Sequence, residues 1–229
     1  MHRTQNTRRF VIILALAIVI VLAVIVFGLF VAKSASYTSG ETGLLTHLAA
    51  SRVPSLVNLS LALDRIFSPL FAALIGLVAA IVVFVITRKW ATVIHFVLLV
   101  AGTWLGSEVV KLIVHRPRPT PRLADVLVPN PDPDSYPSGH VCFAVGLGFA
   151  IFVLIARSRL RVIVGVLAVL LALVTAASRV YLGVHYPTDA VASLVYSAAA
   201  FVGIEVLWRR FGPSPRPATG TIEGQPQPN

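Results

Sequence analysis

The sequence has little charge and almost no cysteine. Only 12% of its 229 residues are charged, whereas soluble domains carry about 25%. That shortage argues against a soluble globular protein. The single cysteine, Cys142, excludes an internal disulfide and, without partners, a thiolate metal site. It leaves the redox compartment undetermined.

Hydrophobic residues make up 57% of the chain and give it a mean hydropathy of +0.86, which is typical of a protein in a lipid bilayer. A helix needs roughly 20 apolar residues to cross the hydrocarbon. Six apolar runs are candidates: Phe10–Ala32, Pro69–Thr87, Ala91–Val114, Val141–Ala156, Val162–Ala177 and Ala190–Leu207. We therefore predict an all-α protein, with one integral membrane domain over residues 1–210 built as a six-transmembrane-helix bundle.

The first apolar run has features of a secretory signal, because the basic residues Arg8 and Arg9 precede it. Its apolar stretch is longer than the roughly 7 to 15 residues of a signal core. We therefore predict an uncleaved transmembrane helix at this position.

Two segments outside the apolar runs are polar. Residues 33–68 are interrupted at Pro54, and we predict an ordered cap or a helix lying in the membrane interface, in preference to a substrate-selecting lid. Residues 211–229 are rich in Pro, Gly, Thr and Gln, so we predict a disordered tail. Within the third run, Gly102 and Gly106 form a GxxxG pair that permits close helix packing. We favour a contact inside the subunit over a homodimer, which stays open.

The net charge of +10 does not indicate nucleic-acid binding, because the sequence lacks a basic stripe with interleaved aromatic residues. Membrane topology explains the charge better. The N-terminus, residues 88–89, residues 157–161 and the tail hold 11 of the 19 Lys and Arg residues, and this side is predicted to be cytoplasmic. Both termini then lie in the cytoplasm. The loops at 115–139 and 179–188 share the extracytoplasmic side.

The first polar motif lies where the third apolar run ends. Lys111 alone suits a lysine paired with Glu108 one turn earlier. Arg118 follows seven residues later, and its guanidinium is a fork suited to phosphate oxygens, which favours anion binding. Arg116 is expected to be a solvated or headgroup-facing neighbour. His115 has no evident partner.

The second motif, Pro137-Ser138-Gly139-His140, stands where the fourth apolar run begins. Ser138 is a plausible N-cap, and glycine allows close approach of the backbone. Free amides at a helix start bind anions. An ordinary capped helix with its histidine facing water is the alternative for this tetrapeptide alone.

The third motif begins with Ser178-Arg179 and continues with His185 and Asp189. Pro187 is tolerated in a first helical turn, so His185 and Asp189 can share a face. An aspartate that accepts from one ring nitrogen leaves the other free to attack. The alternative is a loop histidine beside a capping aspartate.

Together, Lys111-x6-Arg118-Pro119, Pro137-Ser138-Gly139-His140 and Ser178-Arg179-x5-His185-x3-Asp189 resemble the three signatures of type 2 phosphatidic acid phosphatases. Every signature position is matched. The resemblance covers the third to sixth predicted helices. It implies a metal-independent, all-helical phosphatase core of the kind shared with vanadium-dependent haloperoxidases and glucose-6-phosphatase.

The resemblance also implies a role for each motif residue. His185 would be the nucleophile that forms a phosphohistidine, and His140 the acid that protonates the departing oxygen. Asp189 would orient His185. The residues expected to bind the phosphoryl oxygens are Lys111, Arg118, Ser138, Gly139, Ser178 and Arg179.

A metal site in the loop before the second motif is the less favoured interpretation. Asp125, Asp132 and Asp134 lie there, and Mg²⁺ prefers carboxylate ligands. However, Asn-Pro-Asp-Pro-Asp is the composition of a solvated turn. We therefore expect no metal and no other cofactor.

The sequence is best explained by a membrane enzyme that hydrolyses a phosphate or diphosphate ester of a lipid. Undecaprenyl diphosphate, phosphatidic acid and phosphatidylglycerol phosphate are equally good candidates, and membrane lipids are the expected partners. A lipid phosphotransferase and a haloperoxidase are rivals, although the known haloperoxidases are mostly soluble. A non-enzymatic transporter or lipid-binding scaffold is the other alternative. It is less favoured because only Glu108 and Glu205 are intramembrane carboxylates, and His95 is expected to be a satisfied packing residue.

Overall fold

The structure is a computed structural model that describes residues 2–119, 126–128, 132–155 and 160–213. Every regular element among them is helical, which confirms the all-α prediction; the one β-bridge joins Pro117 and Asp134. The helices are α1 (His2–Lys33), α2 (Ala35–Ala50), α3 (Pro54–Ile66), α4 (Pro69–Thr87), α5 (Trp90–Val114), α7 (Gly139–Leu154), α8 (Leu160–Tyr181) and α9 (Pro187–Phe211). The predicted disordered tail falls mostly on residues 214–229, outside this description.

Five helices, α1, α4, α5, α8 and α9, are long and apolar enough to cross a membrane. The predicted six-span count is supported only in part, because α7 has 16 residues and is the shorter apolar helix. At 1.5 Å per residue, α7 is about 24 Å long, less than the hydrocarbon thickness of about 30 Å. It still coincides with the fourth predicted run.

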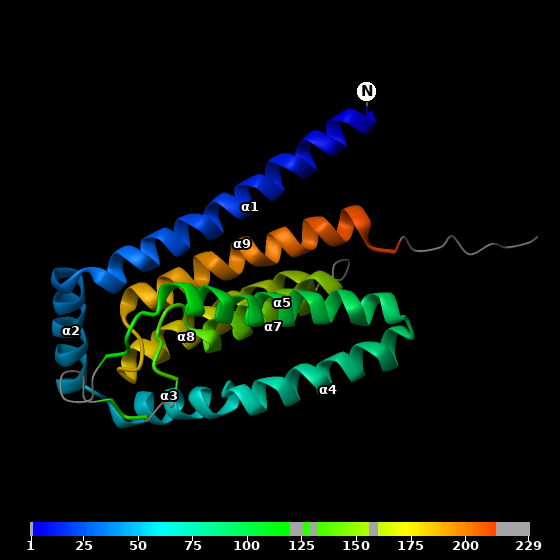
Figure 1. The fold of residues 1–229 in the computed structure, drawn as a ribbon. Helices are drawn as coiled ribbons and strands as arrows, with labels where there is room; N and C mark the ends of the chain where they lie inside the picture. Colours follow the sequence, from blue (N-terminus) through cyan, green and yellow to red (C-terminus); the bar gives the residue numbers. More distant parts are fainter. Residues whose placement is uncertain (1, 120–125, 129–131, 156–159, 214–229) are drawn as a thin grey trace, which may run out of the picture.

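Helix α7 lies at the centre of the bundle. It packs against α5, α8 and α9, while α4 lies along α5 and α1 lies along α9 (Figure 1). Its residues from Val141 to Gly148 are all buried, as expected for a helix that is apolar on every side. The packing fixes the N-terminus of α7 relative to the ends of α5, α8 and α9.

The polar segment predicted as an ordered cap forms α2 and α3. Helix α2 begins where the Ser34 hydroxyl accepts from the amide of Tyr37 at 3.3 Å. Pro54 is the first residue of α3, a position where the missing amide costs nothing. Figure 1 shows α2 standing across one end of the bundle and α3 leading into α4. Both helices therefore lie at the end of the bundle where α5 stops and α7 starts.

His95 and Glu205 form a buried pair between α5 and α9. The His95 Nε2 lies 2.7 Å from a Glu205 carboxylate oxygen, and the ring stacks on Trp208 at 4.7 Å. Glu205 also accepts from Arg209 at 2.5 Å. The prediction of a satisfied packing histidine is confirmed.

The GxxxG pair faces α9 of the same chain, as predicted. A Cβ atom on Gly102 would lie 2.8 Å from Ile204 Cδ1, and one on Gly106 would meet the Tyr196 hydroxyl. The two glycines therefore set how closely α5 approaches α9.

We predict that Gly102→Leu destabilises the protein, because a larger side chain must push α9 away. Overpacking of this kind costs about 1–3 kcal/mol. The thermal midpoint of the detergent-solubilised protein should fall. Gly43→Ala is the control, because a Cβ there would meet no atom within 4 Å. Equal midpoints for the two variants would contradict this account of the α5–α9 contact.

Candidate active site

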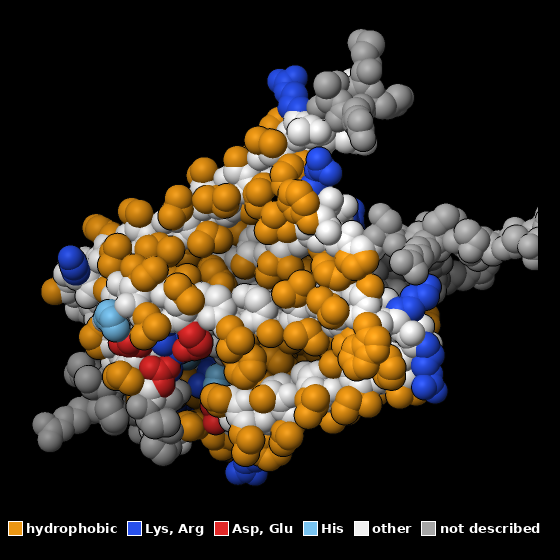
Figure 2. Space-filling model, turned by 45° about the vertical axis from the view of Figure 1, so that its right-hand side comes forward, with side chains coloured by type: hydrophobic (Ala, Val, Ile, Leu, Met, Phe, Trp, Pro, Cys, Tyr) orange, Lys and Arg blue, Asp and Glu red, His pale blue; other side chains and the backbone are white. Residues whose placement is uncertain are grey.

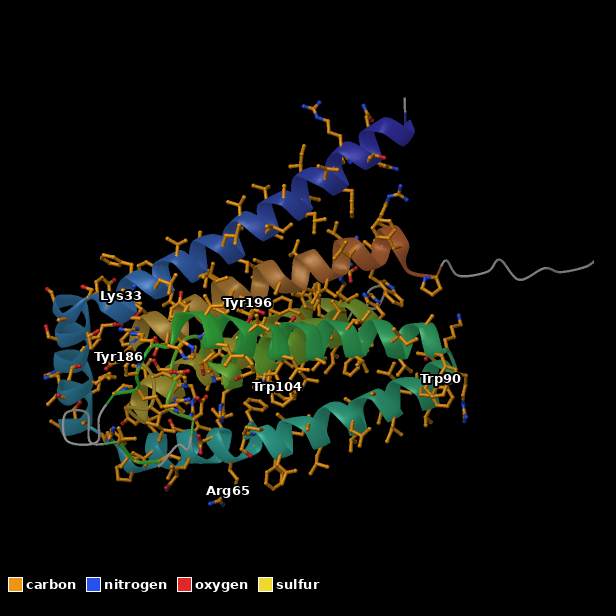
Figure 3. The ribbon with its side chains drawn as sticks, in the orientation of Figure 1. Lys33, Arg65, Trp90, Trp104, Tyr186 and Tyr196 are labelled. Carbon is orange, nitrogen blue, oxygen red and sulfur yellow. The ribbon has the colours of Figure 1, made fainter. Side chains whose placement is uncertain are left out.

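The three motifs meet at one end of the bundle. Lys111 lies in the last turn of α5, Arg179 in the last turn of α8, and Asp189 in the first turn of α9. Figure 2 shows acidic side chains beside Lys, Arg and His side chains at that end, and Figure 3 shows nitrogen and oxygen atoms concentrated there. The buried members of this group are Lys111, Arg116, Ser135, Ser138, Ser178, Arg179, His185 and Asp189.

His185 is held by both ring nitrogens. Its Nδ1 lies 2.7 Å from the carbonyl oxygen of Ser135, and its Nε2 lies 3.0 Å from Nη1 of Arg118. A carbonyl only accepts and a guanidinium only donates, so Nδ1 carries the proton and the lone pair of Nε2 accepts from Arg118. Nε2 is therefore the unprotonated nitrogen of the ring.

The environment of His185 keeps its imidazole neutral. Burial lowers the pKa of His185 well below its usual value, and the nearby cations Arg118, Arg179 and Lys111 lower it further. The hydrogen bond to Ser135 acts in the opposite direction but is weaker. A neutral ring is the form that a nucleophile requires.

Asp189 shares a face with His185, as predicted, but the expected hydrogen bond between them is absent. Its Oδ2 is 3.7 Å from His185 Nδ1 and accepts instead from the Tyr186 amide at 2.9 Å. Its Oδ1 accepts from Arg116 at 2.6 Å. The Ser135 carbonyl takes the place that we expected Asp189 to fill.

Arg116 is buried, so the prediction of a solvated or headgroup-facing residue was wrong. Its guanidinium donates to Glu41 at 2.6 Å, to Asp189 at 2.6 Å and to the Thr188 hydroxyl at 2.7 Å. It also lies 4.1 Å above the Tyr186 ring, which Figure 3 labels. No local pattern in the sequence pointed to Glu41 as its partner.

The chain after α5 explains why Arg116 turns inward. His115 ends the helix in the left-handed conformation, with φ of 49°. Main-chain hydrogen bonds then join Arg116 and Arg118 to the loop before α7, at Ser135 and Pro133. His115, expected to lack a partner, contacts Asp134 at 2.9 Å.

Asp132 lies between two of the predicted phosphate-binding cations. Its carboxylate is 2.5 Å from Lys111 Nζ and 3.4 Å from Arg118 Nη2. Burial favours a higher pKa for Asp132, but the hydrogen bonds from Lys111 and from the Asp134 amide outweigh it and lower the pKa. Lys111 also contacts Glu108 at 3.3 Å, the helix pairing considered for it.

Asp132 and Asp134, the aspartates of this loop that the structure describes, are partly buried and paired. Asp132 binds cations and Asp134 contacts His115. Asp125 lies outside the described residues. Within the described part of the chain, no three His, Cys, Asp or Glu side chains are placed to hold a metal ion.

Three buried polar atoms point to anion binding. Ser138 Oγ and the Nε and Nη2 atoms of Arg179 have no partner among the described residues. Leaving a buried donor unsatisfied costs about 1–3 kcal/mol, so such donors tend to mark sites that take up another molecule. Phosphoryl oxygens are acceptors that would satisfy all three.

Ser138, Ser178 and Gly139, three of the predicted binding residues, contact neighbouring parts of the chain. Ser138 occupies the N-cap position of α7, but its side chain makes no capping bond, and its amide donates to Ser193 at 2.7 Å. The Ser178 hydroxyl donates to the Thr175 carbonyl at 2.7 Å, so its hydrogen is used within α8. Gly139 packs tightly, since a Cβ there would lie 3.1 Å from Glu108 Oε1.

His140 contacts a residue that the sequence analysis did not single out. Its Nε2 lies 3.1 Å from the carbonyl oxygen of Asp64 and 3.6 Å from the Asp64 Oδ1 atom. The same Oδ1 accepts from Nη1 of Arg179 in a short ion pair. Asp64 belongs to α3, in the segment predicted as a cap, and nothing around it in the sequence indicated this contact.

We predict that Arg116→Met strongly destabilises the protein, because it strands the Glu41 and Asp189 carboxylates in the interior. Removing one partner of a buried ion pair costs about 3–5 kcal/mol. Thermal unfolding in detergent measures the loss. Arg65→Met makes the same change on the exposed side of α3 (Figure 3) and should have little effect. A midpoint for Arg116→Met close to that of the parent protein would show that the network is dispensable.

Comparison with known proteins agrees with this geometry. Residues 91–213, more than half of the chain, match the family model described as the PAP2 superfamily. The chain is 36% identical over 81 residues to the putative undecaprenyl-diphosphatase YbjG of Escherichia coli strain K12. That match covers 34% of this chain and 37% of the relative's length.

A solved structure has the same fold. It is the crystal structure of a transmembrane PAP2-type phosphatidylglycerolphosphate phosphatase from Bacillus subtilis, with a TM-score of 0.67. The likeness covers 83% of this chain and 95% of that one, at 20% sequence identity. Similarity at this level shows a shared architecture and supports a multi-pass membrane protein.

Proposed function

The chain belongs to the PAP2 superfamily, and from that membership and its site we propose that it hydrolyses a phosphate or diphosphate ester of a membrane lipid. One observation carries the proposal: Ser138 and Arg179 have buried side-chain atoms without hydrogen-bond partners, in the same site as His185, whose lowered pKa favours the neutral ring. Phosphoryl transfer depends mainly on positioning and on charge compensation at the phosphoryl oxygens. This site offers both.

In the proposed reaction, His185 Nε2 attacks phosphorus and the bond from phosphorus to the lipid oxygen breaks. His140 gives its proton to that departing oxygen, which leaves a phosphohistidine on His185. Water then attacks phosphorus, the phosphorus–nitrogen bond breaks, and His140 takes a proton from the water. The products are inorganic phosphate and the lipid with its terminal phosphoryl group removed.

Cations around His185 would hold the phosphoryl oxygens. Lys111 and Arg118 already hold one anionic group, the Asp132 carboxylate, so a substrate phosphate would compete with Asp132 for them. Arg179 uses Nη1 on Asp64 and has Nε and Nη2 left for two phosphoryl oxygens. Ser138 would add its hydroxyl. In this proposal no step requires a metal ion.

An apolar groove between α4 and α5 is suited to the lipid chain. It has a volume of about 250 Å³ and runs along small residues of α4 that face α5. Trp104, labelled in Figure 3, lines the groove. It also lies next to the α7 motif, because a Cβ atom on Gly139 would be 3.5 Å from Trp104 Nε1. Its lining residues include Ala72, Gly76, Ala80, Val100, Trp104 and Phe143.

We further propose that the site faces the extracytoplasmic side, with both termini in the cytoplasm. The turn between α4 and α5 carries Arg88 and Lys89, and α9 ends with Arg209 and Arg210. Both lie at the end of the bundle opposite α2 (Figures 1 and 2). Loops rich in Lys and Arg remain in the cytoplasm, which supports this orientation.

We predict that the purified protein releases phosphate from at least one of three lipids: undecaprenyl diphosphate, phosphatidic acid or phosphatidylglycerol phosphate. Release should persist with a chelator present, because histidine is the proposed nucleophile. His185→Ala should reduce the rate by about 1,000-fold or more. Absence of release from all three lipids by a folded protein would refute the hydrolase, and full activity of His185→Ala would favour a scaffold.

We predict a bell-shaped dependence of kcat/KM on pH. His185 must be neutral, so activity rises with pH through its pKa, and because burial lowers that pKa the acidic limb should lie below about pH 6.5. The alkaline limb should report loss of the proton from His140. Phosphate release measured from about pH 4 to 9 tests both limbs. A flat profile over that range would contradict the assigned roles.

A further inference from the structure

Asp64 connects a proposed proton donor with a proposed phosphate-binding cation. Its main-chain carbonyl lies 3.1 Å from His140 Nε2, and its carboxylate is 3.6 Å from the same nitrogen. The carboxylate also pairs with Arg179 Nη1. Asp64 precedes the part of the chain that matches the family model, residues 91–213. Asp64 therefore reaches the site from the N-terminal portion of the chain, outside the three motifs.

The last turn of α3 is anchored beside the first turn of α7. Phe67, three residues after Asp64, packs on Phe143, three residues after His140, with ring centroids 5.7 Å apart. Phe67 is buried in the main hydrophobic core. Helix α3 also packs against α8, which carries Arg179. These contacts hold Asp64 in place, as a positioning residue requires.

The contact with Asp64 defines which nitrogen of His140 can reach the substrate. A carbonyl accepts only, so Nε2 carries a hydrogen and donates it to the Asp64 main chain. When the ring is protonated, Nδ1 also carries a hydrogen, and that proton is the one free to leave. The Asp64 main chain thus holds the ring with Nδ1 as its proton-donating atom.

The surroundings of His140 lower its pKa well below the usual value. Burial is the largest cause, and the nearby Arg179, His185 and Arg118 act in the same direction, whereas the hydrogen bond to the Asp64 main chain opposes them. A nearby carboxylate offsets repulsion from such charges. Glu108 lies near the adjacent Gly139, but the carboxylate within 4 Å of the His140 ring in the described structure is that of Asp64.

We propose that Asp64 is a positioning residue that favours the protonated form of His140 and aims its Nδ1 proton at the departing lipid oxygen. This inference rests on the proposed hydrolase function. The Asp64 carboxylate supplies countercharge to His140. The carboxylate itself exchanges no proton. The proton moves from His140 Nδ1 to the lipid oxygen and is replaced from water in the second step.

The test compares two leaving groups in Asp64→Asn, which keeps the main-chain carbonyl and the side-chain size but removes the charge. A lipid alkoxide needs a proton to depart, whereas p-nitrophenolate does not. We expect kcat to fall about 10- to 100-fold on the lipid phosphate and no more than about threefold on p-nitrophenyl phosphate. We also expect the alkaline limb of the lipid profile to move down by about one pH unit.

Asp134→Asn is the matched control, because it removes a carboxylate that contacts the exposed His115 and not His140. It should change neither the ratio of the two substrates nor the alkaline limb. Asp64→Glu restores the charge and should recover part of the lipid activity. In the His140→Ala background, Asp64→Asn should have an effect of no more than about twofold on p-nitrophenyl phosphate turnover.

Equal losses on both substrates with an unmoved alkaline limb would overturn the proposal, because they would show a structural role. A lower KM with unchanged kcat would also overturn it, since Asp64 would then only compete with phosphate for Arg179. If Asp64→Asn fails to fold, Asp64→Ser, which also keeps the main-chain carbonyl and removes the charge, is compared on the same two substrates. The two failures can be told apart with the parent protein. If only the role of Asp64 is wrong, the parent protein is still active on lipid phosphates, whereas if the proposed function is wrong, the parent protein is inactive on them.

Discussion

Burial of positive charge at one end of an apolar bundle is the constraint on which the rest of this structure depends. Lys111, Arg116 and Arg179 are all buried. A cation in such surroundings is costly unless a carboxylate pairs with it. The structure supplies a partner for each: Asp132 for Lys111, Glu41 and Asp189 for Arg116, and Asp64 for Arg179. These carboxylates come from α2, α3, α9 and the loop before α7.

The sequence predicted the parts of the site whose placement is local. Lys111, His140 and Asp189 lie at helix ends that apolar runs and prolines mark clearly, and three motifs at neighbouring ends are bound to meet in a bundle. Arg116 was misjudged because its direction depends on the left-handed turn at His115 and on pairing with the loop before α7. No short-range pattern encodes that turn. The six-span count is supported only in part, because α7 has 16 residues, the same length as its apolar run, and is shorter than the five helices that could cross a membrane.

The carboxylates that pair with the buried arginines could not be predicted from local sequence patterns, because they come from distant segments of the chain. Glu41 and Arg116 are 75 residues apart, and Asp64 and Arg179 are 115 apart. Such pairs depend on how α2 and α3 pack on the bundle. From the sequence alone, a single acidic residue in an amphipathic helix is expected to face solvent. A buried cation is nevertheless a signal, since it requires a carboxylate somewhere. Three cations in the motif region thus imply acidic partners outside it, even when their identity must come from the structure.

The two histidines of this site have different surroundings, which is the basis of the two roles proposed for them. His185 is enclosed by Arg118, Arg179 and Lys111, which disfavour a second positive charge, and a main-chain carbonyl orients its neutral ring. His140 shares two of those cations but stands against the Asp64 carboxylate. Titratable groups whose environments separate their charge states can divide the work of acid and nucleophile at one pH. In the proposed mechanism the difference between the two rings comes from α3, a helix that contributes none of the three motifs. The cap would then contribute to the site as well as the bundle.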